Sequence, residues 1–253
     1  MKRVLLVLLS LALVSGFAFA AGAAPEDESE FRIGLAFDVG GKGDQSFNDS
    51  AYRGLTMLAE EFDGYIADDP DNVDFGSDVE MKYLEPKPGG QDREILLRTL
   101  AEDGYQLIYA VGFAHTDGVA KVSQDFPDTH FVLIDGFIDG LDASSNVTCV
   151  SFAEHEGSFL VGALAGLVLA DNDPGAPIGF LGGMDIPLIH KFHGGYFAGA
   201  MYTNPNLRDP DKLFGQYIGQ DPTAFSDPQG GEAIAVNFFN RGAYIVYHAA
   251  GSS

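Results

Sequence analysis

The sequence predicts an α/β protein with two doubly wound, parallel-sheet lobes, and two observations lead to this fold class. From Phe31 onward, short apolar runs alternate with segments of roughly ten or more residues whose apolar positions recur at helical spacing, as in βαβ units. This alternation occurs twice, with a break at residues 139–145. We therefore expect a first α/β lobe at residues 31–140 and a second lobe at residues 141–253.

In the first lobe, the strands follow from apolar or alternating runs and the helices from 3.6-residue spacing. Gly104 ends one predicted helix and Pro127 follows the end of the next. Residues 63–77 are acidic and rich in Gly, Pro and Asn, which predicts a loop. The expected strands cover residues 31–37, 79–84, 107–112 and 130–135, and the expected helices cover residues 46–62, 91–103 and 116–125.

The second lobe repeats the pattern. The helix at 156–170 is rich in Gly, Ala and Leu, and Gly242 closes the last helix. Cys149 is the single cysteine, and we expect it to be a small core residue of a buried strand. The expected strands cover residues 147–152, 178–182, 213–218 and 244–248, and the expected helices cover residues 156–170, 191–202 and 230–240.

Composition excludes some partners. The 253-residue chain has 37 Asp and Glu residues against 14 Lys and Arg residues, which gives a formal charge of −23. Binding a nucleic-acid backbone needs clustered cations, so we expect no nucleic-acid partner. The charge also disfavours docking on anionic lipid. It is typical of a solvated acidic surface, and adaptation to a salty medium is a second interpretation.

The N-terminus has the pattern of a secretory signal peptide. Lys2 and Arg3 precede an apolar run at residues 4–13, and residues 18–20 (Ala-Phe-Ala) have the small-x-small form of a cleavage site. We expect a signal peptide at 1–20, an acidic leader at 21–30, and export to the periplasm or to the outer face of the cytoplasmic membrane. No cysteine lies near the cleavage site, so a lipid anchor on cysteine is not expected.

The stretch from Asp38 to Asn48 (Asp-Val-Gly-Gly-Lys-Gly-Asp-Gln-Ser-Phe-Asn) carries the strongest functional signal. It follows a predicted strand, and ligands of open α/β sheets bind beyond the carboxyl ends of the strands. A simple turn explains the glycines by positive φ and Ser46 as the N-cap of the next helix. It does not explain Phe47, an aromatic residue in a polar loop.

A phosphate-binding loop is a second interpretation of the same stretch, but the G-x-G-x-x-G pattern fails and the aspartates would repel a phosphate. A neutral, ring-bearing ligand fits better. Asp38 accepts hydrogen bonds, Asn48 both donates and accepts them, and Phe47 offers a stacking face.

This stretch resembles the signature of the basic membrane protein family, the nucleoside-binding components of bacterial ABC importers. The resemblance continues in order along most of the chain, at residues 111–117, 131–135, 156–166, 178–192 and 247–251. It implies a type I periplasmic-binding fold that closes on a nucleoside, with a purine favoured. It further implies ABC permease and ATPase partners, a monomer, and no cofactor, metal or catalytic residue.

The family's motif also implies roles for particular residues. Asp38 matches a carboxylate near the ligand, Phe47 the first stacking ring, and Asn48 an amide that contacts the base. Asp117 matches a carboxylate that holds ribose hydroxyls, and Gly251 a backbone contact at the lobe edge. For the second ring, Phe225 is the preferred match, with Phe192 as runner-up, because Phe192 shares a helical face with Tyr196 and Ala200 that is typical of a core.

Two departures and two alternatives accompany this resemblance. The family often carries an N-terminal lipid-anchoring cysteine, which is not seen here. The family also continues past the Ala-Ala-Gly element at 249–251 with further ligand-facing elements, so we expect this chain to be a fragment rather than a naturally shortened form. One alternative is a nucleoside hydrolase that uses Asp38 and Asp44 on a metal. The other is a sensory or surface receptor on the same fold.

Overall fold

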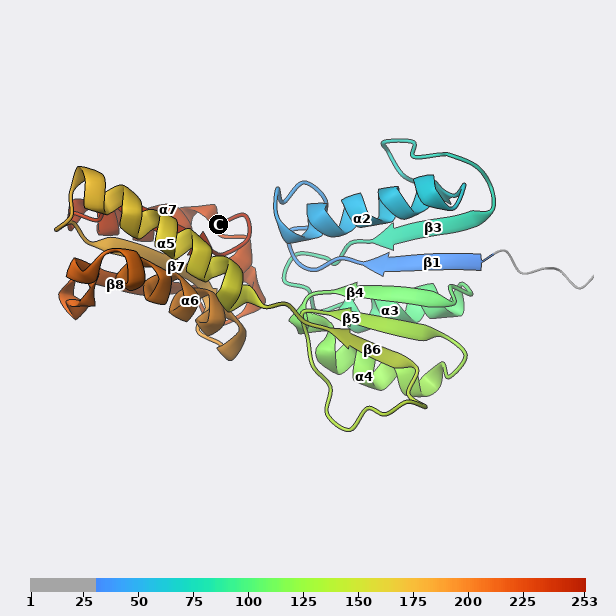
Figure 1. The fold of residues 1–253 in the computed structure, drawn as a ribbon. Coiled ribbons are helices and arrows are strands. Elements are labelled where there is room, and N and C mark those ends of the chain that lie inside the picture. The colour runs from blue at the N-terminus through green and yellow to red at the C-terminus, as the bar shows by residue number, and fades with distance from the viewer. Residues whose placement is uncertain (1–30) are drawn as a thin grey trace, which may run out of the picture. The chain divides into compact units, whose positions relative to one another are not determined.

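The computed structural model describes residues 31–253, and the predicted signal peptide and acidic leader lie outside the described residues. The first sheet has six parallel strands in the order β2-β3-β1-β4-β5-β6. Figure 1 shows β3, β1, β4, β5 and β6 side by side in this order. These strands are β1 (Phe31–Ala36), β2 (Tyr65–Ile66), β3 (Val79–Leu84), β4 (Leu107–Val111), β5 (His130–Ile134) and β6 (Val147–Val150).

Helices cover both faces of the first sheet. The helix α2 (Phe47–Glu61) packs on one face, where Leu35 of β1 joins a core cluster with Leu55. The helices α3 (Arg93–Glu102) and α4 (Thr116–Asp125) pack on the other face, where Ala36 joins Leu97. Neighbouring residues of β1 therefore point to opposite layers, as the period of two in a strand requires.

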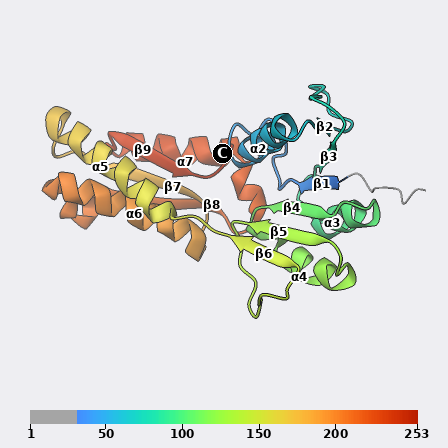
Figure 2. The same ribbon diagram turned by 45° about the vertical axis from the view of Figure 1, so that its right-hand side comes forward.

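The second sheet has three parallel strands in the order β8-β7-β9: β7 (Ile178–Met184), β8 (Leu213–Gly219) and β9 (Ile245–Ala249). Its helices are α5 (Glu154–Asn172), α6 (Pro187–Thr203) and α7 (Pro228–Asn240) (Figure 2). Along residues 31–253, no helix combines the length and apolarity that a bilayer crossing requires.

Glycines let α5 and α6 pack closely. A Cβ at Gly162 of α5 would lie 1.9 Å from the carbonyl oxygen of Tyr196, and a Cβ at Gly199 of α6 would lie 1.9 Å from that of Phe159. Any side chain at these positions would push the helices apart. The glycines and alanines that the sequence concentrates in this stretch thus form a helix–helix contact, with Tyr196 and Ala200 buried in the same core.

The expected α/β class and parallel sheets are confirmed. The lobe boundary expected at residues 139–145 does not coincide with the division between the two sheets. The strand β6 pairs with β5, from Phe131 with Val147 to Ile134 with Val150, so it belongs to the first sheet. The connection to the second sheet therefore follows Val150. Pairing between strands is a long-range contact, and a polar loop inside a lobe has the same local composition as a linker between lobes.

Candidate functional site

A cavity of about 460 Å³ lies where strands of both sheets end, which is within the usual range for ligand sites. Residues that follow β1, β4 and β5 line it from the first sheet, and residues of β9, α6 and the turn after β8 line it from the second. Six of the seven site residues predicted from the sequence are in this lining: Asp38, Phe47, Asn48, Phe192, Phe225 and Gly251. Their contact with a ligand stays a prediction.

Asp44 organises the loop between β1 and α2. Its carboxylate accepts hydrogen bonds from the backbone N–H groups of Ser46 (2.8 Å), Asn48 (2.9 Å) and Asp49 (3.1 Å). Asp44 therefore satisfies the free N–H groups at the start of the helix. The expectation that Ser46 caps this helix through its side chain is wrong, because that side chain makes no capping bond.

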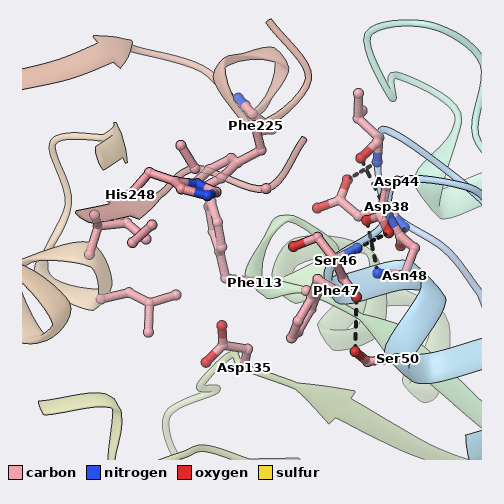
Figure 3. A pocket seen from close by; sticks show the side chains of 18 of the residues that line it. Asp38, Asp44, Ser46, Phe47, Asn48, Ser50, Phe113, Asp135, Phe225 and His248 are labelled. Atoms are coloured by element: carbon pink, nitrogen blue, oxygen red, sulfur yellow. Dashed lines mark hydrogen bonds between the residues drawn. The ribbon is translucent and has the colours of Figure 1, made fainter. Parts of the chain in front are cut away.

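Asn48 is buried, with 2% of its surface exposed, and its amide holds the loop together. Its Oδ1 accepts from the backbone N–H of Asp38 at 3.0 Å, and its Nδ2 donates to Asp44 at 2.9 Å. Figure 3 shows Asp38, Asp44 and Asn48 gathered on one side of the cavity. Nδ2 of Asn48 also donates to the carbonyl oxygen of Val39 at 3.5 Å, so the capacity left for a ligand is the second lone pair of Oδ1.

Arg93 of α3 pairs with Asp38. Its Nε donates to Oδ1 of Asp38 at 2.8 Å, and its Nη2 contacts the same oxygen. Both side chains are mostly buried, with 12% and 15% exposed. Gly112 makes room for this pair, because a Cβ there would lie 2.9 Å from the other carboxylate oxygen of Asp38. Asp38 therefore reaches the cavity as a fixed carboxylate.

His115 lies behind Asp38 and is fully buried. Burial lowers its pKa, although the charge of Asp38 partly opposes this. Its Nε2 lies 3.0 Å from the carbonyl oxygen of Phe37, which can only accept, so Nε2 carries the proton of a neutral ring. His115 is thus a structural contact between β1 and the 3₁₀ turn Phe113–His115 that follows β4.

Aromatic side chains from both sheets meet at the cavity. Phe225 lies in the 3₁₀ turn Pro222–Phe225 after β8, and its ring contacts Phe113 edge to face, with centroids 6.1 Å apart. Gly183 of β7 accommodates the Phe225 ring, because a Cβ there would lie 2.4 Å from a ring carbon. Phe113 and Gly183 were not predicted as site residues, and only the folded chain brings them to Phe225.

Asp135 is a further residue of the cavity that the sequence-based prediction missed. It follows β5 directly, with φ of 63°, and Figure 3 shows it apart from the loop carboxylates. Burial and the nearby Glu154 raise its pKa to about 6. Glu154 bonds Lys191 of α6 at 3.0 Å. Oδ1 of Asp135 and Oε1 of Glu154 are buried without hydrogen-bond partners. The position of Asp135 directly after a strand is the sequence signal that could have identified it as a site residue.

Asp117 is the predicted site residue that the structure does not bring to the cavity. It lies exposed on the first turn of α4, outside the cavity lining. The hydrolase alternative also loses support, because the carboxylates of Asp38 and Asp44 are engaged by protein donors. Among residues 31–253, no group of three or more His, Cys, Asp and Glu side chains is placed to hold a metal ion.

Two parallel α/β sheets with a ligand-sized cavity at their carboxyl ends define the class of type I periplasmic-binding proteins. The family model described as ABC transporter substrate-binding protein PnrA-like matches residues 32–253. The chain belongs to this family, which confirms the resemblance found in its motifs.

Relatives and solved structures agree with this assignment. An uncharacterized lipoprotein of Pyrococcus abyssi is 35% identical, over 97% of this chain and 56% of the relative. The ABC transporter nucleoside-binding protein BmpA of Lactococcus lactis is 29% identical, over 99% of this chain and 65% of the relative. The crystal structure of a solute-binding protein from Aeropyrum pernix K1 matches with a TM-score of 0.69 and 29% identity, over 88% of this chain and 55% of that chain. The chain therefore spans between 55% and 65% of these proteins.

Proposed function

We propose that this protein is the extracytoplasmic binding component of an ABC importer and that its cavity takes a purine nucleoside. The observation that carries the proposal is the cavity lining, in which Phe47 at the start of α2 and Phe225 in the turn after β8 come from different lobes and Asp38 and Asp135 add carboxylates. Stacking on an aromatic ring contributes roughly 1–3 kcal/mol per base. Carboxylate oxygens accept hydrogen bonds from ribose hydroxyls.

The charges around the cavity favour a nucleoside over a nucleotide. The lining contains three aspartates, Asp38, Asp44 and Asp135, and its described residues include no lysine or arginine. Phosphate groups are usually bound by Arg, Lys or helix N-termini. A phosphorylated ligand would therefore meet repulsion here, whereas a neutral ring with hydroxyl groups would not.

Delivery of the ligand to a permease and ATPase is part of the same proposal, since the family is one of ABC transporter substrate-binding proteins. The relative in Lactococcus lactis is named a nucleoside-binding protein, and the relative in Pyrococcus abyssi is named a lipoprotein. The first name supports a binding role, and the second supports a location outside the cytoplasm.

Isothermal titration calorimetry with adenosine, guanosine, uridine and adenosine monophosphate tests the ligand class. We expect adenosine and guanosine to bind, uridine to bind more weakly because its base offers a smaller stacking face, and the monophosphate not to bind. The absence of heat with every nucleoside would contradict the proposal. Release of free base during incubation, detected by chromatography, would support the hydrolase instead.

The variant Phe47→Ala tests the stacking contact. We expect it to weaken nucleoside binding by roughly 1–3 kcal/mol, because the ring face is lost while the polar groups remain. Phe62→Ala is the matched control, since Phe62 lies at the other end of the same helix and is 50% exposed. Equal affinities of Phe47→Ala and Phe62→Ala would contradict a stacking role for Phe47.

A further inference from the structure

Lys42 lies in the ligand-facing loop but bonds away from that loop, to residues 67–73 between β2 and β3. Its Nζ lies 3.0 Å from Oδ1 of Asp69 and 2.8 Å from Oδ2 of Asp71. The side chain of Asp69 has no exposed surface, and that of Lys42 is 18% exposed. Lys42 is not among the residues that line the cavity. The ion pair with Asp69 therefore joins two loops in a largely buried place.

Every acceptor site of Asp69 has a donor. Besides Lys42, its oxygens accept from the hydroxyl of Tyr52 on α2 (2.8 Å) and the hydroxyl of Tyr83 on β3 (3.3 Å). The backbone N–H of Val73 donates at 3.4 Å. A carboxylate accepts about four hydrogen bonds, so this network is complete. It connects the loop of Lys42 to a helix, a strand and a second loop of the first lobe.

Lys42 stays charged in this setting. Burial opposes its charge, but hydrogen bonds with Asp71, Tyr52 and Asp69 raise its pKa overall. Its Nζ also lies 3.8 Å from the centroid of the Tyr52 ring, a cation–π contact. A buried carboxylate and a charged ammonium hold each other in place more firmly than an exposed pair does.

The neighbours of Lys42 need such an anchor. Gly41 and Gly43 have φ of 58° and 97°, conformations that glycine adopts and leaves readily. Their backbone N–H groups donate to nearby residues, to the carbonyl oxygen of Asp38 (3.1 Å) and to the carboxylate of Asp49 in the first turn of α2 (2.7 Å). Those bonds close the turn on itself and on the start of α2, and Arg93 holds its first residue, Asp38. The bond from Lys42 to Asp69 is the one that ties the middle of the loop to the segment between β2 and β3.

We propose that Lys42 is a positioning residue for the ligand site: its ion pair with Asp69 holds the loop 38–48 in the conformation that binds ligand. The inference rests on the proposed function, because it concerns the residues that would contact a nucleoside. Lys42 acts through the loop, and its own charge stays outside the cavity. If the loop is competent for only a fraction of the time without this pair, the apparent affinity falls by that fraction.

Two variants separate positioning from folding. Lys42→Met alone leaves Asp69 as an unpaired buried charge, so it is expected to destabilise the whole lobe. The double variant Lys42→Met/Asp69→Asn removes the pair without leaving a buried charge, and the Asn oxygen still accepts from a tyrosine hydroxyl. Lys82→Met is the matched control, because Lys82 pairs with Asp68 of the same segment at 3.3 Å, so this change removes an ion pair there and leaves Lys42 and Asp69 in place.

The test combines hydrogen exchange of the ligand-free protein with calorimetry of adenosine and guanosine. For the double variant we expect faster exchange in the peptide covering residues 38–48, unchanged exchange in β4 and β5, and roughly tenfold weaker nucleoside binding. The single variant Lys42→Arg keeps the charge, so it should bind nucleosides more tightly than the double variant does. Lys82→Met should behave as the wild type in both measurements.

Unchanged exchange at 38–48 in the double variant would overturn the proposal, as would wild-type affinity. Loss of the core protection of β4 and β5 together with that of the loop would also overturn it, because the pair would then be a general stabiliser. If the wild-type protein binds no nucleoside, the proposed ligand is wrong. The exchange measurement still decides whether the ion pair holds the loop.

Discussion

The loop at 38–48 on the first sheet and the aromatic residues on the second sheet line the same cavity, but they are held in place in different ways. We call residues 38–48 with Arg93 the polar wall. We call Phe192, Phe225 and residues 249–251 the aromatic wall. Figure 3 shows members of the two walls on opposite sides, with Asp38 and Asn48 facing Phe225.

Hydrogen bonds shape the polar wall. Asp44 accepts three backbone N–H groups, Asn48 bridges Asp44 and Asp38, and Arg93 holds the carboxylate of Asp38. Directional bonds of this kind set side-chain positions before a ligand arrives. The polar wall is therefore pre-organised in the ligand-free protein.

Packing shapes the aromatic wall. The ring of Phe225 rests on Gly183, and a Cβ at Gly251 would lie 2.6 Å from the carbonyl oxygen of Phe225. Phe192 packs partly against the core of the second lobe. Phe225 thus depends on space left by glycines rather than on side-chain hydrogen bonds. The comparison predicts that substitutions that remove a charge damage the polar wall. Substitutions that add side-chain volume damage the aromatic wall.

Arg93→Met breaks the polar wall and should have the largest effect on stability. Removing one partner of a mostly buried ion pair leaves an uncompensated charge, here on Asp38, at a cost of about 3–5 kcal/mol. Urea unfolding of the variant measures this loss. The double variant Arg93→Met/Asp38→Asn should recover much of it, because neither charge then remains.

Arg98→Met is the matched control for Arg93→Met. Arg98 lies on the same helix and bonds Asp125 of α4 at 2.7 Å, in an exposed position. Water screens such pairs, so we expect a much smaller loss of stability. If Arg93→Met cost no more than Arg98→Met, charge pairing would not be what holds the polar wall.

Gly183→Ala should damage the aromatic wall through volume. The added methyl group would overlap the Phe225 ring, and overpacking of this kind costs about 1–3 kcal/mol. In a Phe225→Ala background the ring is absent, so the same change should cost little. Urea unfolding of the wild type, both single variants and the double variant measures this coupling.

Gly194→Ala on α6 is the control for the added methyl group, because nothing lies within 4 Å of a Cβ there. It should be neutral or stabilising, since Ala favours helix more than Gly does. Additive effects of Gly183→Ala and Phe225→Ala would show that Gly183 does not position the ring. The packing account of the aromatic wall would then be wrong.

The polar wall was easier to predict from the sequence than the aromatic wall. Residues 38–48 follow a strand and precede a helix, so local patterns alone place Asp38 and Phe47 at the carboxyl end of the sheet, where ligands bind. Gly183 shows why the other wall is harder. We expected the strand to end at residue 182, whereas β7 runs to Met184 and includes Gly183, which contacts the Phe225 ring. That contact joins residues far apart in the sequence.

Local signals also explain the outcomes for the helices. The helix expected at 116–125 is observed as Thr116–Asp125, and Pro127 follows it. The helix α6 begins at Pro187, four residues before the expected start, because proline is favoured in the first turn of a helix. The strand β6 was assigned to the wrong lobe, since only its pairing with β5 reveals its sheet.

Oδ1 of Asp135 is buried without a hydrogen-bond partner, unlike the carboxylates of Asp38 and Asp44, and Asp135 supplies the smallest predicted effect. Lys191 is the charged group that bonds the neighbouring Glu154, while Asp38, Asp44, Tyr247 and His248 are the other titratable groups lining the cavity. Burial and Glu154 raise the pKa of Asp135 to about 6, above the usual value of 3.8. The folded state therefore binds the extra proton more tightly than the unfolded state does.

The sign of the pH dependence follows from this shift. The stabilising effect of the proton is fully present below about pH 4 and is lost as pH rises through about 6. Asp135→Asn removes the charge, tolerates the positive φ, and can donate to Glu154. Its Tm should exceed that of the wild type at about pH 8, and the difference should shrink towards pH 4. Asp139→Asn, at an exposed residue of the following loop, should show no such change. A Tm difference for Asp135→Asn that is the same at both pH values would show that Asp135 and Glu154 do not form a proton-linked pair.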